Sequence, residues 1–199
     1  MPHRDFLMPL GSLRENTAGL KRADAIIVSK SPEQLTTQEQ EKIKQRYLKI
    51  STQHIYFTTI KYTNLQPIIV ANSEILLNKL SEYNVLLVTG IANAYSIKNF
   101  LNKTCLSFKH LAYPDHYNYQ LEDLQRIEKE YELLGEKKIV ITTEKDSYKF
   151  KEIVKYTNFA GSFVNSFYCL LIEVQFLNNA SNLFENQIIT YVEKNKRNR

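Results

Sequence analysis

The sequence is poor in the residues that mark several common classes of protein. It has only two cysteines, Cys105 and Cys169, which lie in apolar surroundings without CxxC or Cys/His spacing. Isolated cysteines of this kind are typical of reduced, buried thiols rather than of a disulfide or a metal site, which suits the cytosol. The longest apolar runs, "VLLV" and "YCLLI", are too short to span a bilayer. We therefore expect a soluble chain, or at most one peripheral to a membrane.

Arginine is also scarce, with 7 Arg against 19 Lys. Arginine is the residue expected for bidentate recognition of phosphates and guanine edges. The formal net charge is +5, but the last six residues, "KNKRNR", hold four basic residues and no acid, so the rest of the chain carries only +1. A basic terminal run of this kind is typical of a solvated helix end, with a phosphate or membrane-surface contact as the alternative. The sequence predicts no nucleic-acid partner.

Short sequence motifs of known catalytic sites are missing as well. None of the five glycines stands in a GxxxxGK[ST] phosphate loop, and the chain has no GxGxxG, HExxH or GxSxG. The sequence therefore contains no complete catalytic apparatus that can be identified from motifs alone.

Apolar runs that resemble strands alternate with segments that resemble helices. The runs are residues 25–29, 55–60, 67–70, 85–89, 138–143 and 168–176, with a weaker one in "LSFKHLAY". The clearest helix is "QLEDLQRIEKEYELLG", in which apolar residues recur every 3 to 4 positions before Gly135. Such alternation predicts an α/β fold with a mostly parallel sheet covered on both faces.

Ligands of such sheets gather at the carboxyl ends of the strands, where loops lead into helices. Three polar loops follow strands here: "TGIANAY", "PDHYNY" and "TTEKDSYK". We expect all three to lie at one edge of the sheet.

The "GIAN" loop has two interpretations. Gly90 permits the backbone to approach a nucleotide or phosphate, or it simply makes a tight turn between strand and helix. Asn93 is a plausible N-cap for the helix "AYSIKNFL".

The "TEKD" loop resembles a capping box, because Thr143 and Asp146 have the spacing that opens a helix after a strand. The cap explains these two residues without any function. Glu144 and Lys145 would then project from the carboxyl edge of the sheet, and packing does not account for their charges.

In "PDHY", Pro114 stiffens the turn that holds Asp115 and His116. A carboxylate beside an imidazole can fix its tautomer and raise its basicity, although adjacent residues need not touch. A turn in which His116 bonds only to backbone is the alternative. The neighbouring tyrosines Tyr113, Tyr117 and Tyr119 are expected to pack.

Near the N-terminus, Arg14 and Glu15 form an adjacent charged pair. They are either solvent-exposed, where such a pair adds little stability, or they line an anion or metal site. Spacing alone does not decide between these interpretations.

Taken in order, "LMPLGSLRE", "KRADAIIVSK", "TGIANAYSIKNFL", "FKHLAYPDHYNY" and "ITTEKDSYK" resemble the second part of the tetraacyldisaccharide 4'-kinase family, in a Bacteroidetes-like version. The resemblance covers about residues 7–176. It implies a Rossmann-like, P-loop NTPase-like three-layer fold, mostly parallel and truncated at its N-terminal side. It also implies ATP and Mg as cofactors, a lipid disaccharide substrate and transfer of the γ-phosphoryl group to the 4'-hydroxyl in lipid A biosynthesis.

The resemblance also implies roles for individual residues. His116 matches the histidine that supports a catalytic aspartate, with Asp115 beside it. Glu15 matches an acidic residue near the metal and phosphates, with Arg14 next to it. Gly90 and Asn93 match the family's "GIAN" loop. The "TEKD" loop is matched by Thr143, Glu144, Lys145 and Asp146. Both loops are expected to shape the nucleotide side of the cleft.

In the family, the phosphate loop, the membrane-facing helix and the catalytic aspartate precede the segment at which this chain begins. We therefore expect residues 1–30 to be the remnant of a P-loop domain and residues 31–199 to be a C-terminal α/β domain. The fragment is expected to be inactive alone, whereas the full-length enzyme is expected at the cytoplasmic face of the inner membrane, which it contacts through the missing N-terminal part. The alternative is a non-enzymatic Rossmann-like module that binds an anionic ligand.

Overall fold

The structure is a computed structural model that describes residues 15–69, 73–155 and 159–196. Contacts divide the chain into two compact units. Unit 1 comprises residues 1–61 and 173–199, and unit 2 comprises residues 62–172. The predicted division at residue 30 does not coincide with either boundary, and the origin of residues 1–30 in a P-loop domain stays a prediction.

Six strands form one hydrogen-bonded order, β1-β2-β6-β5-β3-β4, and their pairings are parallel for β1 with β2, β3 with β4, β3 with β5 and β5 with β6. The prediction of an α/β fold with a mostly parallel sheet is confirmed. The strands are β1 (Ala25–Val28), β2 (His54–Pro67), β3 (Asn84–Thr89), β4 (Ser107–Ala112), β5 (Lys138–Thr143) and β6 (Phe167–Phe176).

Helices connect the strands, as the alternating pattern predicts. The α-helices are α1 (Thr37–Tyr47), α2 (Tyr95–Thr104), α3 (Leu121–Glu132), α4 (Glu144–Val154), α5 (Gly161–Val164) and α6 (Ser181–Lys196). The 3-10 helices are η2 (Thr17–Arg22), η3 (Leu77–Glu82) and η4 (Leu177–Asn179).

The longest strand differs from its prediction. The segments 55–60 and 67–70 were expected to be separate strands, but β2 runs without a break from His54 to Pro67. The polar stretch between them is mostly half-buried and includes Tyr62 and Thr63, both of which favour extended backbone. Pro67 is the last residue of the strand, and the Ile68 N–H that follows it still donates to the Phe167 carbonyl at 3.0 Å.

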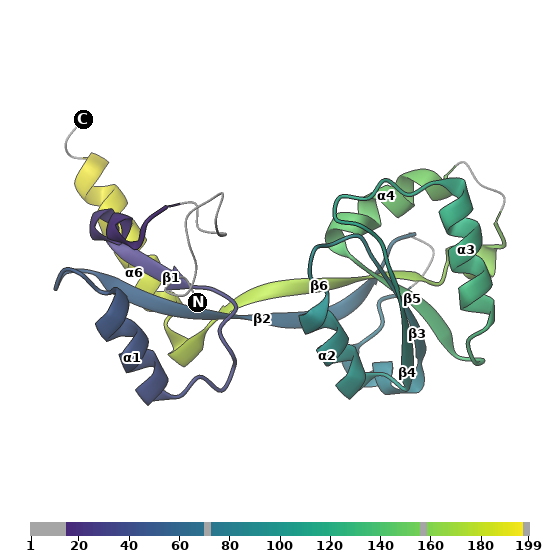
Figure 1. The fold of residues 1–199 in the computed structure, drawn as a ribbon, viewed down its shortest axis with the longest axis horizontal. Coiled ribbons are helices and arrows are strands. Elements are labelled where there is room, and N and C mark those ends of the chain that lie inside the picture. The colour runs from purple at the N-terminus through teal and green to yellow at the C-terminus, as the bar shows by residue number, and fades with distance from the viewer. Residues whose placement is uncertain (1–14, 70–72, 156–158, 197–199) are drawn as a thin grey trace. The chain divides into compact units, whose positions relative to one another are not determined.

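The core of unit 2 lies on both faces of its sheet. Leu86 and Val88 of β3 point to the face covered by α3 and α4, whereas Val85 and Leu87 point to the face covered by α2 (Figure 1). Strand side chains alternate between faces, so one strand contributes to both layers of packing. Unit 2 therefore has the predicted three-layer arrangement of helix, sheet and helix.

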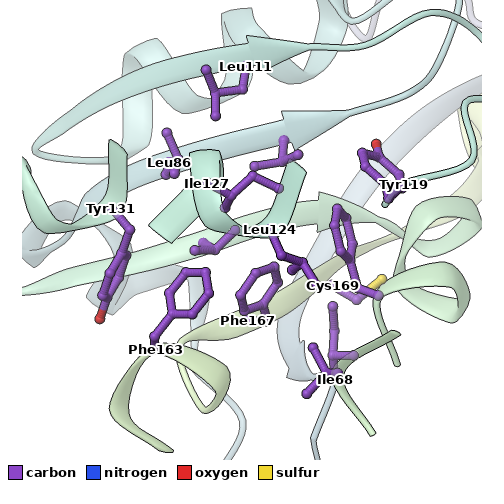
Figure 2. Packing of buried hydrophobic residues seen from close by; sticks show 14 residues of the cluster. Ile68, Leu86, Leu111, Tyr119, Leu124, Ile127, Tyr131, Phe163, Phe167 and Cys169 are labelled. Carbon is purple, nitrogen blue, oxygen red and sulfur yellow. The ribbon is translucent and has the colours of Figure 1, made fainter. Parts of the chain in front are cut away.

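Aromatic rings fill the α3/α4 face. Phe163 and Phe167 lie side by side with Tyr131 of α3, as Figure 2 shows, at ring-centroid distances of 5.1 Å between the two phenylalanines and 5.4 Å from Phe163 to Tyr131. Phe150 of α4 is fully buried among Tyr119 and Phe167. These ring contacts fix α3 and α4 on the sheet.

Both cysteines are free thiols, as expected from the sequence. Burial raises the pKa of the Cys169 thiol to about 11 and also raises the pKa of the Cys105 thiol. Because the thiolate is the reactive form of cysteine, a raised pKa disfavours reaction at both side chains.

Candidate functional site

The three polar loops meet at the carboxyl edge of the sheet in unit 2. Strand β3 lies between β5 and β4 in the strand order. The connection after β3 leads to α2 on one face, and the connection after β5 leads to α4 on the other. Neighbouring parallel strands whose connections diverge in this way form a switch point, where open α/β sheets bind ligands. The predicted position of the site is thus supported by the topology.

A buried carboxylate joins the first loop to the third. The side chain of Asp146 is fully buried, and its Oδ2 accepts hydrogen bonds from the Gly90 N–H at 2.9 Å and from the Thr143 hydroxyl at 2.8 Å. Thr143 is the N-cap of α4, as predicted, and its Oγ1 accepts from the Asp146 N–H at 3.2 Å. Asp146 therefore does more than cap its own helix, because it also holds the end of β3.

The second loop, "PDHYNY", is hydrogen-bonded to Gly90 as well. The His116 N–H donates to the Gly90 carbonyl at 3.2 Å and to Oδ1 of Asp115 at 3.0 Å. His116 has a φ of 60°, in the left-handed region that few residues other than glycine adopt, although histidine is among the more tolerant. The two hydrogen bonds stabilise this backbone conformation.

The imidazole of His116 points into solvent. Its side chain is 79% exposed, and its Nε2 lies 3.8 Å from Oδ2 of Asp115. The Lys145 ammonium donates to Oδ1 of Asp115 at 2.9 Å, and this hydrogen bond is the main cause that lowers the pKa of the Asp115 carboxyl. Asp115 thus faces both a lysine and a histidine, and the His116 imidazole is open to solvent.

The tyrosines of this loop pack together, as expected. The rings of Tyr113, Tyr117 and Tyr119 lie 4.9 to 5.4 Å apart, and Tyr119 also contacts Phe150. Burial raises the pKa of the Tyr119 hydroxyl, and the Asp146 carboxylate raises it further. Tyr119 therefore anchors the loop as a neutral side chain.

Lys149 belongs to the same arrangement, although the motif search did not find it. Its ammonium donates to the Tyr117 carbonyl at 2.6 Å and lies 3.7 Å from Oδ1 of Asp146. Lys149 follows Asp146 by three residues, so the two share one face of α4. That spacing is the signal in the sequence that could have identified it.

Asn93 is placed differently from its prediction. The residue at the N-cap of α2 is Ala94, and the side chain of Asn93 instead accepts a hydrogen bond from the Tyr95 N–H at 2.8 Å. Asn93 therefore stabilises the turn that enters α2 from one position earlier. Glu144 is exposed in the first turn of α4, as expected.

The structure describes one of the two charged residues predicted near the N-terminus. Glu15 belongs to unit 1, where it is exposed and forms an ion pair with Arg22 at 2.8 Å. Arg14 lies outside the described residues. The roles predicted for both stay predictions.

The implied cofactors do not fit the groups just described. Within residues 15–69, 73–155 and 159–196, no group of three His, Cys, Asp or Glu side chains could hold a metal ion. The Gly90 N–H, the donor expected to approach a phosphate, is taken by the Asp146 carboxylate. Glu144 and Asp146 also place two acidic residues in the first turn of α4, where they disfavour an anion. We therefore assign no step to a metal or phosphate at this point.

Gly90 is a position where the structure leaves little room for a side chain. A Cβ at residue 90 would lie 3.1 Å from the Tyr119 hydroxyl, 3.2 Å from Oδ1 of Asp146 and 3.3 Å from the Pro114 carbonyl. The neighbouring atoms would have to shift by a few tenths of an ångström to accommodate it. Figure 2 shows Tyr119, one of these neighbours, among the buried side chains of the core.

We expect Gly90→Ala to lower the free energy of unfolding by about 1–3 kcal/mol, because overpacking a buried position strains its neighbours. Urea denaturation of the two proteins measures this difference. Gly161→Ala is the matched control, since a Cβ there meets nothing within 4 Å. Equal stability losses in the two variants would contradict the close packing of the three loops.

Comparison with known proteins identifies a family that matches almost the whole chain. A sequence model of the family described as tetraacyldisaccharide-1-P 4'-kinase matches residues 3–192. The chain is 34% identical over 203 residues to the tetraacyldisaccharide 4'-kinase of Bacteroides thetaiotaomicron and 33% identical over 196 residues to that of Phocaeicola vulgatus. Each alignment covers 98% of this chain and 53% of the relative. The chain therefore spans about half the length of the curated relatives that it matches.

A solved structure is similar as well. The chain resembles a crystal structure of LpxK from Aquifex aeolicus in complex with ATP, with a TM-score of 0.51 and 20% sequence identity. The match covers 92% of this chain and 47% of that one. At that identity, the likeness shows a shared fold. Among the helices in the described part of the chain, none has the length and apolarity needed to cross a membrane.

Proposed function

Because the chain belongs to the tetraacyldisaccharide-1-P 4'-kinase family, we propose that it is the C-terminal part of an ATP-dependent lipid kinase. The complete enzyme transfers the γ-phosphoryl group of ATP, with Mg²⁺, to the 4'-hydroxyl of a tetraacyldisaccharide 1-phosphate in lipid A biosynthesis. It works at the cytoplasmic face of the inner membrane, which it contacts through its N-terminal part.

The observation that carries this proposal is the convergence of three family motifs around His116. Gly90, Asp115 and Lys145 come from three different loops, yet all are linked to the short segment that presents the His116 imidazole to solvent. Phosphoryl transfer requires a group that takes up the proton of the attacking hydroxyl. A solvent-facing imidazole held by a structured loop suits proton transfer, or the support of a carboxylate that performs it.

The other predicted residues keep their roles as parts of this proposal. Asp115 orients His116, and Glu15 and Arg14 act near the metal and phosphates. Gly90 and Asn93, together with Thr143 and Glu144, shape the nucleotide side of the cleft. Thr143 does so indirectly, because its hydroxyl is bound to Asp146.

We further propose that residues 1–199 alone do not phosphorylate the lipid. The sequence contains no GxxxxGK[ST] loop, whose backbone N–H groups and lysine hold the β- and γ-phosphates in enzymes of this kind. Neither a metal cluster nor a phosphate contact is offered by the described groups around His116. We propose that both come from the part of the enzyme that carries the phosphate loop.

The test compares two proteins. The first is the 199-residue chain, and the second, called here the assembled kinase, is this chain fused behind the N-terminal half of the Bacteroides thetaiotaomicron relative. With ATP, Mg²⁺ and the tetraacyldisaccharide 1-phosphate, we expect phosphorylation by the assembled kinase only. Turnover by the 199-residue chain would refute its inactivity, and a folded, ATP-binding fusion that leaves the lipid unmodified would refute the kinase proposal.

A further inference from the structure

The backbone at His116 is in a conformation that its neighbours must maintain. A non-glycine residue with φ near 60° is strained by on the order of 1 kcal/mol or more, and such residues persist where the surroundings determine them. The strain at His116 occurs at the residue that the proposed function places in proton transfer. The question is therefore which residues hold it.

Helix α4 supplies three of the contacts that reach the His116 segment. Lys145 donates to the Asp115 side chain at 2.9 Å, and the same Asp115 oxygen accepts the His116 N–H. Asp146 binds the Gly90 N–H at 2.9 Å, and the Gly90 carbonyl accepts the His116 N–H. Lys149 donates to the Tyr117 carbonyl, directly after His116.

These contacts enclose the segment from both of its ends. Asp115 precedes His116 and Tyr117 follows it, and each is bound by a lysine of α4. Lys149 follows Lys145 by four positions, about one helical turn, so the two lysines project from one side of α4. Helix α4 is itself fixed to the sheet by the buried ring of Phe150.

A nucleotide-binding role explains these same residues less well. The Lys145 ammonium is 2.9 Å from a carboxylate oxygen and follows the exposed Glu144. The side chain of Asp146 is fully buried and accepts hydrogen bonds from the Gly90 N–H and the Thr143 hydroxyl, so it is not open to contact with a phosphate. The two lysines are directed to the loop that carries His116, and Asp146 is directed to Gly90, whose carbonyl accepts the His116 N–H.

We propose that Lys145, Asp146 and Lys149 form a clamp of positioning residues that holds His116 in its left-handed conformation and aims its imidazole at the reacting groups. The clamp itself is a property of unit 2. Its effect on catalysis rests on the proposed function.

The structural test uses the labelled 199-residue chain and nuclear magnetic resonance. The signals of the His116 backbone amide and imidazole are assigned with His116→Asn. We expect Lys145→Met and Lys149→Met to shift both signals, because each variant releases one side of the segment. Lys145→Arg should restore them, since arginine keeps the charge and the hydrogen bond to Asp115. Lys151→Met, at an exposed lysine of the same helix, is the control and should leave them in place.

Signals of His116 that stay unchanged in both Lys145→Met and Lys149→Met would overturn the clamp. Lys145 and its partner Asp115 are 40% and 42% exposed, and ion pairs near the surface add little to stability, so Lys145→Met is expected to fold with little loss. Lys149 lies 3.7 Å from the fully buried Asp146, so Lys149→Met is expected to lose more stability. Melting temperatures above the temperature of the measurement, in both variants and in the control, confirm that a shift at His116 reflects position rather than unfolding.

The kinetic test uses the assembled kinase. Displacing a catalytic group by about 1 Å can cost about 100-fold in rate, so we expect Lys145→Met and Lys149→Met to lower kcat by about 10- to 100-fold. The KM for ATP should stay unchanged, because a positioning residue acts on the chemical step. A raised KM for ATP with unchanged kcat would overturn the clamp in favour of nucleotide binding. An assembled kinase without activity would contradict the proposed function, while the nuclear magnetic resonance result would still decide the clamp.

Discussion

Replacing His116 in the assembled kinase is expected to lower kcat by about 100-fold or more, the usual range for the loss of a group that transfers protons. The suitable variant is His116→Asn rather than alanine. Asparagine tolerates a positive φ, so the loop keeps its backbone and loses only the imidazole. Steady-state phosphorylation of the lipid with saturating ATP measures the effect.

Asn118→Ala is the control for this variant, because Asn118 is exposed in the same loop and contributes its backbone carbonyl to the hydrogen bond with Gln120. We expect its kcat to match that of the unaltered protein. If His116→Asn also matched it, His116 would have no part in the mechanism, and the convergence of the three loops would serve stability alone.

The second large effect is expected at Phe150. This side chain is fully buried between Tyr119 and Phe167, with ring centroids at 4.3 and 5.3 Å. Phe150→Ala should lower the free energy of unfolding by about 3–5 kcal/mol, the sum of lost burial and a remaining cavity. That is a large part of the roughly 5–15 kcal/mol of a typical domain.

Urea denaturation of the 199-residue chain, followed by circular dichroism, measures this loss. Tyr148→Ala is the matched control, since Tyr148 lies on the same helix but is 67% exposed. A stability loss at Phe150 no larger than that at Tyr148 would contradict the packing of α4 against the sheet. Because α4 also carries the clamp, Phe150→Ala should weaken the hold on His116 as well.

Local patterns in the sequence were sufficient for the strands and helices that have strong periodicity. Strands β3 and β5 are near-continuous apolar runs because both of their faces are buried, and α3 shows a regular apolar stripe. The extension of β2 through a polar stretch was missed, since its burial depends on neighbours that a local pattern does not contain. For the same reason, local patterns do not locate the boundaries of the two compact units, which fall after residues 61 and 172.

The candidate site was predicted in outline and not in its connections. The motifs correctly placed the three loops at one edge of the sheet, but the contact of Lys145 with Asp115 joins residues 30 positions apart. That contact depends on β3 pairing with β5, where Val88 lies opposite Thr142. Once this register is known, Gly90 and Asp146 can be predicted to be neighbours. Propensity and spacing alone cannot predict the pairing of β3 with β5, because strand order is a property of the whole sheet.

The uneven distribution of buried side chains has a consequence for the exchange of backbone amide hydrogens with solvent. Both hydrophobic clusters of the described residues lie in unit 2, whereas α6 of unit 1 has no buried residue along its 16 positions. Amides open locally where few apolar contacts resist opening and exchange only through global unfolding in a dense core. The amides of β3 should therefore be the last to exchange and those of α6 among the first. Hydrogen exchange will then measure two different free energies of opening in one molecule.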